Sequence, residues 1–172
     1  NADADDLELD LTNAHLPSLE EVDLPAALRA LDLTANRLKT LEPRVAALPA
    51  LTRLCLRQNL LSEPAEVAAL AAAPGLRHLE LRDNAYTAVP DLAAFTALTY
   101  LELSYNQLRS LAPLAALEAP ALEELYAAAN KITAIEGVSQ LTSLRVLELG
   151  SNRVREIAGL EPLAGLRELW LG

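Results

Sequence analysis

A fixed order of leucines and polar residues recurs along this chain. Residues 144–152 (LRVLELGSN) place leucines first, fourth and sixth and an asparagine ninth, with other residues between them. Around the fourth and sixth places this order predicts a short strand, whose two leucines face inward while the residue between them faces outward. The asparagine falls where the chain turns out of the strand. Copies of the order place this asparagine at Asn36, Asn59, Asn84, Asn106, Asn130 and Asn152.

The spacing of the copies indicates the fold. Successive asparagines are separated by 22 to 25 residues, and this leucine order with a period of about 20 to 29 residues is typical of leucine-rich repeats. We therefore predict an α/β fold, a curved leucine-rich-repeat solenoid. Short parallel strands line its concave face, and helical or irregular returns line its convex face. An asparagine amide both donates and accepts, so the six asparagines are expected to form a ladder that satisfies backbone groups at the turns.

The repeats also predict the domain organisation. Residues 1–6 (NADADD) read as an acidic lead-in, and residues 7–172 as one repeat domain. This domain has a degenerate first repeat with Ala14 in place of the asparagine, six further repeats, and a partial eighth. Because the chain lacks an initiator methionine, we expect that it begins inside a longer product or after processing, and because it stops inside a repeat, we expect further sequence after Gly172. Apolar residues three apart behind the asparagines predict tight helical turns, and residues 64–73 predict a fuller helix.

Composition restricts the kinds of partner that the chain is expected to bind and the cellular compartment in which it is expected. The formal net charge of -10 and the pI of about 4.6 argue against nucleic acid or an anionic membrane and favour a basic protein surface. The alternative is that the acids only keep the repeat array soluble. Cys55 is the single cysteine, so no intrachain disulfide can form, which fits a reducing, intracellular location. We expect it to be a small residue on the outward strand face.

Residues that could perform chemistry are scarce. His15 and His78 fall in different repeats, Cys55 has no obvious base beside it, and the sequence contains no glycine-rich phosphate loop or metal-ligand motif. We therefore predict that the protein is not an enzyme and that it uses no cofactor or metal.

The outward residues of the strands are the candidate binding surface. Exposed Trp and Tyr framed by carboxylates are typical of protein-binding hot spots, although bulky residues on adjacent strands can also simply pack against each other. We expect Arg53, Arg57 and Arg82 to pair with Asp32 and Glu80. The row between the paired leucines reads Asp10, Asp32, Cys55, Glu80, Glu102, Tyr126, Glu148 and Trp170, and the row beside it reads Ala30, Arg53, His78, Tyr100, Glu124, Val146 and Glu168.

Several segments of the chain resemble one family. Residues 31–38 (LDLTANRL), 54–60 (LCLRQNL), 147–155 (LELGSNRVR) and 168–172 (ELWLG) are similar to the leucine-rich-repeat regulatory subunit of protein phosphatase 1, the regulatory subunit 7 family. The similarity runs from about Leu28 to Gly172, and it is strongest to members from plants and green algae.

This resemblance implies a non-catalytic regulator whose concave face binds the catalytic subunit of protein phosphatase 1. It also implies an effect on the maturation, stability or targeting of that subunit in cytoplasm and nucleus, with room for a third regulatory subunit. The alternative is a structural scaffold in a ciliary or cytoskeletal complex. The family's contact positions match Glu102, Tyr126, Glu148 and Trp170 here, and we place Glu80, Tyr100, Glu124 and Glu168 in a secondary group.

Overall fold

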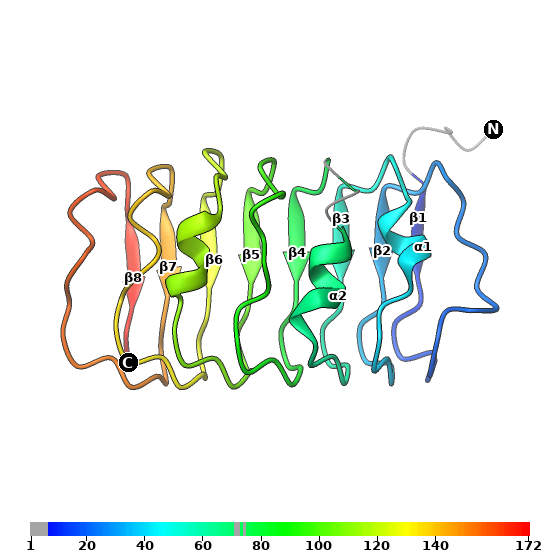
Figure 1. Cartoon of the computed structure of the whole chain (residues 1–172), viewed down its shortest axis with the longest axis horizontal. Helices are drawn as coiled ribbons and strands as arrows, with labels where there is room; N and C mark the ends of the chain where they lie inside the picture. The colour runs from blue at the N-terminus through cyan, green and yellow to red at the C-terminus, as the bar shows by residue number, and fades with distance from the viewer. Residues whose placement is uncertain (1–6, 71–72, 74) are drawn as a thin grey trace.

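The structure, a computed structural model, describes residues 7–70, 73 and 75–172, so the predicted lead-in of residues 1–6 lies outside the described residues. Within this part, eight strands form one parallel sheet in the order of the sequence (Figure 1). The predicted repeat solenoid is confirmed. The strands are β1 (Glu8–Asp10), β2 (Ala30–Asp32), β3 (Arg53–Cys55), β4 (His78–Glu80), β5 (Tyr100–Glu102), β6 (Glu124–Tyr126), β7 (Val146–Glu148) and β8 (Glu168–Trp170).

The strand register places equivalent leucines side by side. Leu31 pairs with Leu54, Leu54 with Leu79, and the same alignment continues through every strand to Leu169. The central leucines of β2 to β7 are at most 1% exposed. Burying a leucine side chain stabilises the folded state by about 1.5–3 kcal/mol, so each repeat is stabilised mainly by stacking on its neighbours.

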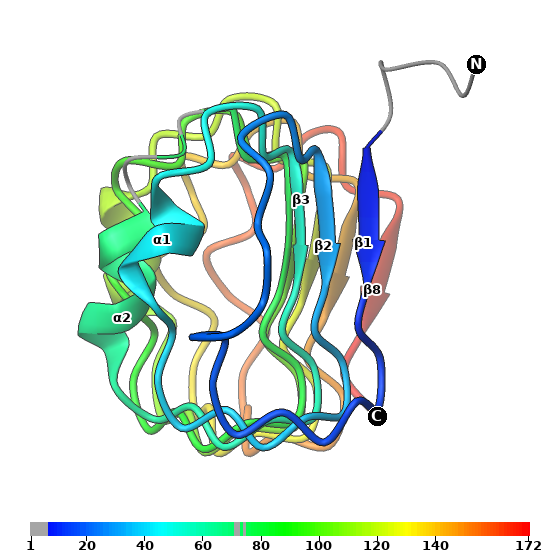
Figure 2. The same cartoon turned by 90° about the vertical axis from the view of Figure 1, so that its right-hand side faces the viewer.

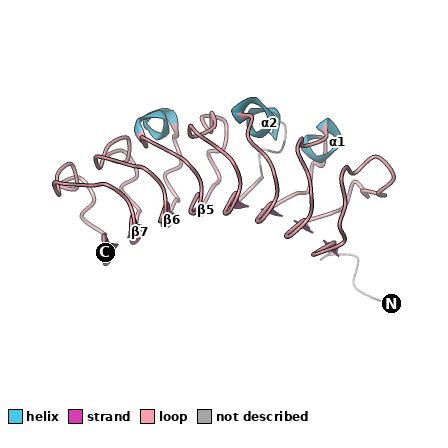
Figure 3. Cartoon of the chain, turned by 90° about the horizontal axis from the view of Figure 1, so that it is seen from below, coloured by secondary structure: helices cyan, strands magenta, loops and turns pink. Residues whose placement is uncertain are grey.

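The returns form the opposite, convex side of an arch, as the end-on and lower views show (Figures 2 and 3). They carry α1 (Pro43–Ala46), α2 (Pro64–Ala69) and the 3-10 helix η2 (Ala112–Ala116), each with a proline at its first or second position. The tight helical turns predicted from apolar residues three apart do not form, because these segments are irregular turns and bends; the returns are thus a mixture of helical and irregular segments, as the fold prediction allowed. A helix begins at Pro64 as predicted but ends at Ala69, and residues 71–72 and 74 lie outside the described residues.

Each ladder asparagine satisfies backbone groups of two repeats. Asn106 Oδ1 accepts from Tyr86 N at 3.1 Å, and Asn106 Nδ2 donates to the carbonyls of Leu81 and Leu103, each at 3.0 Å. Each of the other five asparagines makes the equivalent contacts with its own repeat and the repeat before it. The residue before each asparagine has a positive φ, which turns the chain sharply out of the strand; these residues are Ala35, Gln58, Asp83, Tyr105, Ala129 and Ser151.

One expected core position is exposed. Ile157 belongs to the apolar series of the returns, yet it is 64% exposed, whereas the equivalent Ile135 is 8% exposed. The return that contains Ile135 is packed between two neighbouring returns. In this structure the return that contains Ile157 has a neighbouring return on one side. No helix in the described part of the chain has the length and apolarity needed to cross a lipid bilayer.

Candidate functional site on the concave face

The concave face is lined by the outward residues of the strands, but those residues are not equally accessible. Trp170 is 58% exposed, whereas Cys55 is 2% exposed and Glu80 and Glu102 are each 6% exposed. The expectation that Cys55 is a surface residue is therefore wrong. Neighbouring side chains cover these three residues, although their Cα–Cβ bonds point out of the sheet as the alternation requires.

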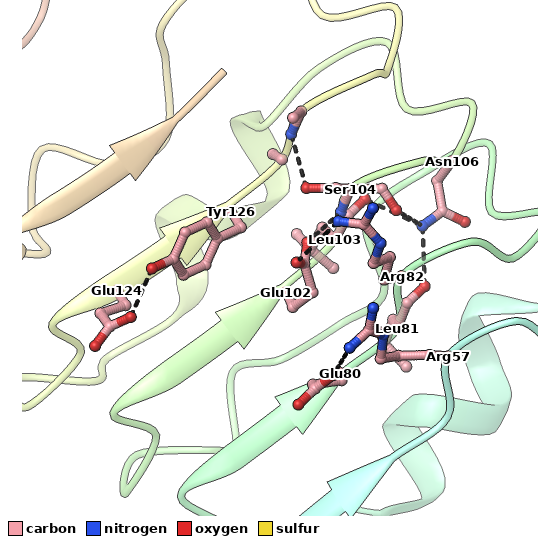
Figure 4. Close-up of polar contacts among 12 residues, drawn as sticks. Arg57, Glu80, Leu81, Arg82, Glu102, Leu103, Ser104, Asn106, Glu124 and Tyr126 are labelled. Atoms are coloured by element: carbon pink, nitrogen blue, oxygen red, sulfur yellow. Dashed lines mark hydrogen bonds and ion pairs between the residues drawn. The ribbon is translucent and has the colours of Figure 1, made fainter. Parts of the chain in front are cut away.

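Arginines cover the two buried carboxylates. Arg57 Nη1 lies 3.5 Å from Glu80 Oε2, and Arg53 Nη2 lies 3.9 Å from Glu80 Oε1. Arg82 Nη1 lies 3.8 Å from Glu102 Oε2, so it pairs with Glu102 and not with the predicted Asp32 or Glu80 (Figure 4). Glu102 Oε1 also accepts from Ser104 N at 2.7 Å. We call β3 to β5, with these residues, the arginine-paired region.

Cys55 and His78 meet at Glu80. His78 Nε2 is 2.6 Å from Glu80 Oε1, and Cys55 Sγ is 3.5 Å from the same oxygen. Burial alone raises the pKa of Glu80, but the hydrogen bond and charge of His78, with Cys55 and Arg57, lower it overall. Burial and the nearby Glu80 raise the pKa of the Cys55 thiol to about 12. The thiol is therefore protonated at neutral pH, which argues against a nucleophilic cysteine.

A row of rings links the strands in the middle of the face. His78 stacks on Tyr100 with ring centroids 4.1 Å apart, and Tyr100 lies 5.3 Å from the ring of Tyr126. The Tyr126 hydroxyl donates to Glu124 Oε2 at 2.7 Å (Figure 4). Burial and the charge of Glu102 raise the pKa of Tyr100 to about 12. The predicted contact residue Tyr126 is thus half-buried and held by cross-strand packing as well as facing the concave side.

On β6 to β8 the carboxylates have no cationic partner. Among the described residues, no lysine, arginine or histidine forms an ion pair with Glu124, Glu148 or Glu168. Trp170 Nε1 donates to Glu168 Oε2 at 3.3 Å, which directs the indole along the strand. We call β6 to β8, with these three glutamates, Tyr126 and Trp170, the acidic-aromatic region.

Comparison with known proteins agrees with this architecture. The family described as leucine rich repeat matches residues 74–132, and the family described as leucine rich repeats in two copies matches residues 120–164. Solved structures share the fold. Internalin C2 of Listeria monocytogenes has a TM-score of 0.72 and 27% identity, covering 96% of this chain and 80% of its own. A leucine-rich-repeat protein of Leptospira interrogans has a TM-score of 0.73 and 27% identity, covering 96% of this chain and 48% of its own. The chain therefore has the leucine-rich-repeat fold.

Among curated proteins, it is similar to the protein phosphatase 1 regulatory inhibitor subunit PPP1R7 homolog of Arabidopsis thaliana. The two are 46% identical over 105 residues, which is 60% of this chain and 32% of the relative. The predicted resemblance to plant members of that family is confirmed, and the chain spans about a third of the relative's length. The relative is named as a regulatory subunit and not as a catalyst, in agreement with the prediction that the chain is not an enzyme.

Proposed function

We propose that this chain is a non-catalytic regulator that binds the catalytic subunit of protein phosphatase 1 through the acidic-aromatic region. The observation that carries the proposal is a large exposed ring on one rigid strand face, beside carboxylates that form no ion pair with the described residues. Trp170 is 58% exposed, and Trp and Tyr are enriched among the residues that dominate protein interfaces. The name of the Arabidopsis relative supports the choice of partner.

The residues have distinct roles in this proposal. Trp170 and Tyr126 are the apolar anchors, and Glu148 faces basic groups of the partner. Glu124 and Glu168 hold Tyr126 and Trp170 through hydrogen bonds of 2.7 and 3.3 Å, so they shape the surface and add to its negative potential.

The acids and rings nearer the N-terminus act less directly. Glu102 is buried against Ser104 and Arg82, so it contributes through the position of Arg82 as well as by its charge. Glu80 is likewise buried, and Tyr100 supports the ring of Tyr126. These contacts lie at the edge of the proposed interface.

The charge pattern fits a basic partner. A negative potential attracts a positive surface and speeds encounter, and it repels nucleic acid and anionic lipid. By binding, the chain affects the maturation, stability or targeting of the catalytic subunit, in cytoplasm and nucleus, with a third regulatory subunit able to join the complex.

Replacing the most exposed anchor tests the proposal. Trp170→Ala should weaken binding to purified catalytic subunit by at least about 2 kcal/mol, or roughly thirtyfold, because truncating a central aromatic anchor removes that much. Titration calorimetry measures the affinity. Ile157→Ala is the matched control, because Ile157 is also apolar and is 64% exposed, but it lies on a return. Circular dichroism should show the same fold for both variants. Wild-type affinity of Trp170→Ala would reject this site.

A structural scaffold in a ciliary or cytoskeletal complex is the second candidate. It would use the returns or the ends of the solenoid, where Ile157 and Leu60 are exposed at 64% and 50%. In that case the Ile157→Ala variant loses its partner, and the Trp170→Ala variant keeps it. The same pair of variants therefore separates the two functions.

A further inference from the structure

Three side chains of metal-binding type meet on the concave face between β3 and β4. The ligand atoms of Cys55, His78 and Glu80 all lie within 4.8 Å of one another. No spacing of Cys, His or acidic residues along the sequence predicts this cluster, and the proposed phosphatase surface does not use Cys55 or His78. The structure therefore brings together a cluster that needs its own explanation.

The backbone holds the three residues rigidly. Cys55 and Glu80 are paired across β3 and β4, and His78 lies two residues before Glu80, so all three point to the same face. Leu79, between His78 and Glu80, and Leu54, next to Cys55, are both 0% exposed and fix the two strands to the core. Side-chain rotation alone therefore sets the distances among the ligand atoms.

Neighbouring groups orient two of the three ligands. The His78 ring stacks on Tyr100 at 4.1 Å and an interplanar angle of 8°. Arg57 Nη1 lies 3.5 Å from Glu80 Oε2, whereas the other oxygen, Oε1, faces His78 and Cys55 and has Arg53 Nη2 at the longer distance of 3.9 Å. Contacts of this kind around the ligands are what align them in metal sites.

The donor set selects the class of ion. A thiolate, an imidazole and a carboxylate together suit Zn²⁺ or Co²⁺, whereas Mg²⁺ and Ca²⁺ prefer oxygen ligands. With bonds of about 2.0–2.3 Å, neighbouring ligands of a tetrahedral ion lie roughly 3.3–3.8 Å apart. The pair His78 Nε2 and Glu80 Oε1, now 2.6 Å apart, must therefore open by roughly 1 Å, and Cys55 Sγ already lies 3.5 Å from Glu80 Oε1.

We propose that Cys55, His78 and Glu80 form a site for one divalent cation of the zinc class, with the fourth position open to water. The thiolate and the carboxylate balance the two charges of the ion. On binding, the Cys55 thiol proton and any proton held between His78 and Glu80 leave to solvent.

Charges of both signs surround the three ligands. Asp32 is the strand neighbour of Cys55 on β2, and its negative charge partly offsets the guanidinium groups of Arg53 and Arg57 beside Glu80. A concave pocket of about 110 Å³ borders Cys55 and is lined in part by Asp32 and Arg53.

Cobalt titration of the full chain, in the absence of chelator and with a non-thiol reductant, tests the proposal. Co²⁺ should saturate at one equivalent and give the charge-transfer absorption of a cobalt thiolate, and Zn²⁺ should displace it. Cys55→Ser should abolish the absorption. His78→Gln and Glu80→Gln should each weaken Co²⁺ binding at least tenfold. Zn²⁺ should also raise the melting temperature of the parent chain, because the ion binds the folded state.

The control removes the other histidine. His15→Asn should bind Co²⁺ like the parent, because His15 is exposed on the first repeat and has a positive φ that asparagine tolerates. Circular dichroism establishes that each variant is folded at the titration temperature. Absence of a saturable thiolate absorption overturns the site, and so does equal affinity in the parent, His78→Gln and Glu80→Gln, which would mean binding by the thiol alone. Phosphatase binding does not enter these measurements, so the two proposals fail separately.

Discussion

The arginine-paired and acidic-aromatic regions share one backbone design but differ in the state of their carboxylates. Glu80, Glu102 and Glu148 occupy equivalent places between paired leucines. Glu80 and Glu102 are each 6% exposed and paired with arginines of this chain. Glu148 is half-buried and has no ion pair within the described residues.

A single position of the repeat explains this difference. The residue after the second inward leucine reaches the acid of the next repeat, as Arg57 does with Glu80 and Arg82 with Glu102. Later repeats have Ser104, Ala128 and Gly150 at this place. These residues are too short to cover the strand that follows. The acids and rings of the later strands are therefore not covered by an arginine of the preceding repeat, whereas Glu80 and Glu102 are.

The largest expected difference between the regions is in stability. Glu102→Ala should lower the free energy of unfolding by about 2 kcal/mol, because it leaves the Ser104 N–H and the Arg82 guanidinium without a buried partner. Glu148→Ala should change it by less than about 0.5 kcal/mol. Urea denaturation followed by circular dichroism measures both. Equal losses in the two variants would show that the regions do not differ as described.

Transplanting the arginine should convert one region into the other. Ala128→Arg places a guanidinium at the position that Arg82 occupies two repeats earlier, within reach of Glu148. It should weaken binding of the phosphatase catalytic subunit about tenfold, or about 1.4 kcal/mol, since a paired carboxylate attracts a basic partner less. Surface plasmon resonance at low salt measures the change.

The control for this transplant carries the same charge to the convex side. Ala115→Arg lies exposed on η2, so it alters the net charge equally without touching Glu148. It should leave the affinity close to that of the parent. If both variants weaken binding alike, the effect comes from net charge and not from the pairing of Glu148.

The sequence predicts what depends on position within one repeat. The leucine order predicts the strands, their parallel order and the buried face, and the asparagines predict the turns, because these features are periodic and local. The conformation of the returns is predicted less well, because apolar residues three apart are compatible with both a 3-10 turn and an irregular turn.

Contacts between repeats are what the sequence pattern leaves undetermined. The burial of Glu80 depends on Arg57, 23 residues earlier, and the cluster at Cys55 joins residues 25 positions apart. An alignment of the repeats indicates both contacts. In it, Arg57 and Glu80 fall in adjacent rows, and Cys55 and Glu80 fall in the same column. The exposure of Ile157 likewise depends on what packs against its return.

The smallest expected effect concerns the hydroxyl of Tyr126. At neutral pH, Tyr126→Phe should lower the free energy of unfolding by less than about 1 kcal/mol, because it removes one hydrogen bond to Glu124 and keeps the ring. Burial, with the hydrogen bond to Glu124, raises the pKa of Tyr126 in the folded chain. Its stabilising contribution is therefore complete below the unfolded pKa of about 10 and is lost as the pH rises above it.

The pH dependence of the Tyr126→Phe variant tests the contribution of this hydroxyl. Urea denaturation between about pH 8 and pH 11 should show the free energy of unfolding falling less steeply in Tyr126→Phe than in the parent, because the variant lacks the group that the folded state keeps protonated. Tyr105→Phe is the control, since Tyr105 is 51% exposed and its ring lies over Arg82. If the two variants follow the same pH profile, Glu124 does not hold the Tyr126 proton. Glu124 would then be as free as Glu148 to meet a basic partner.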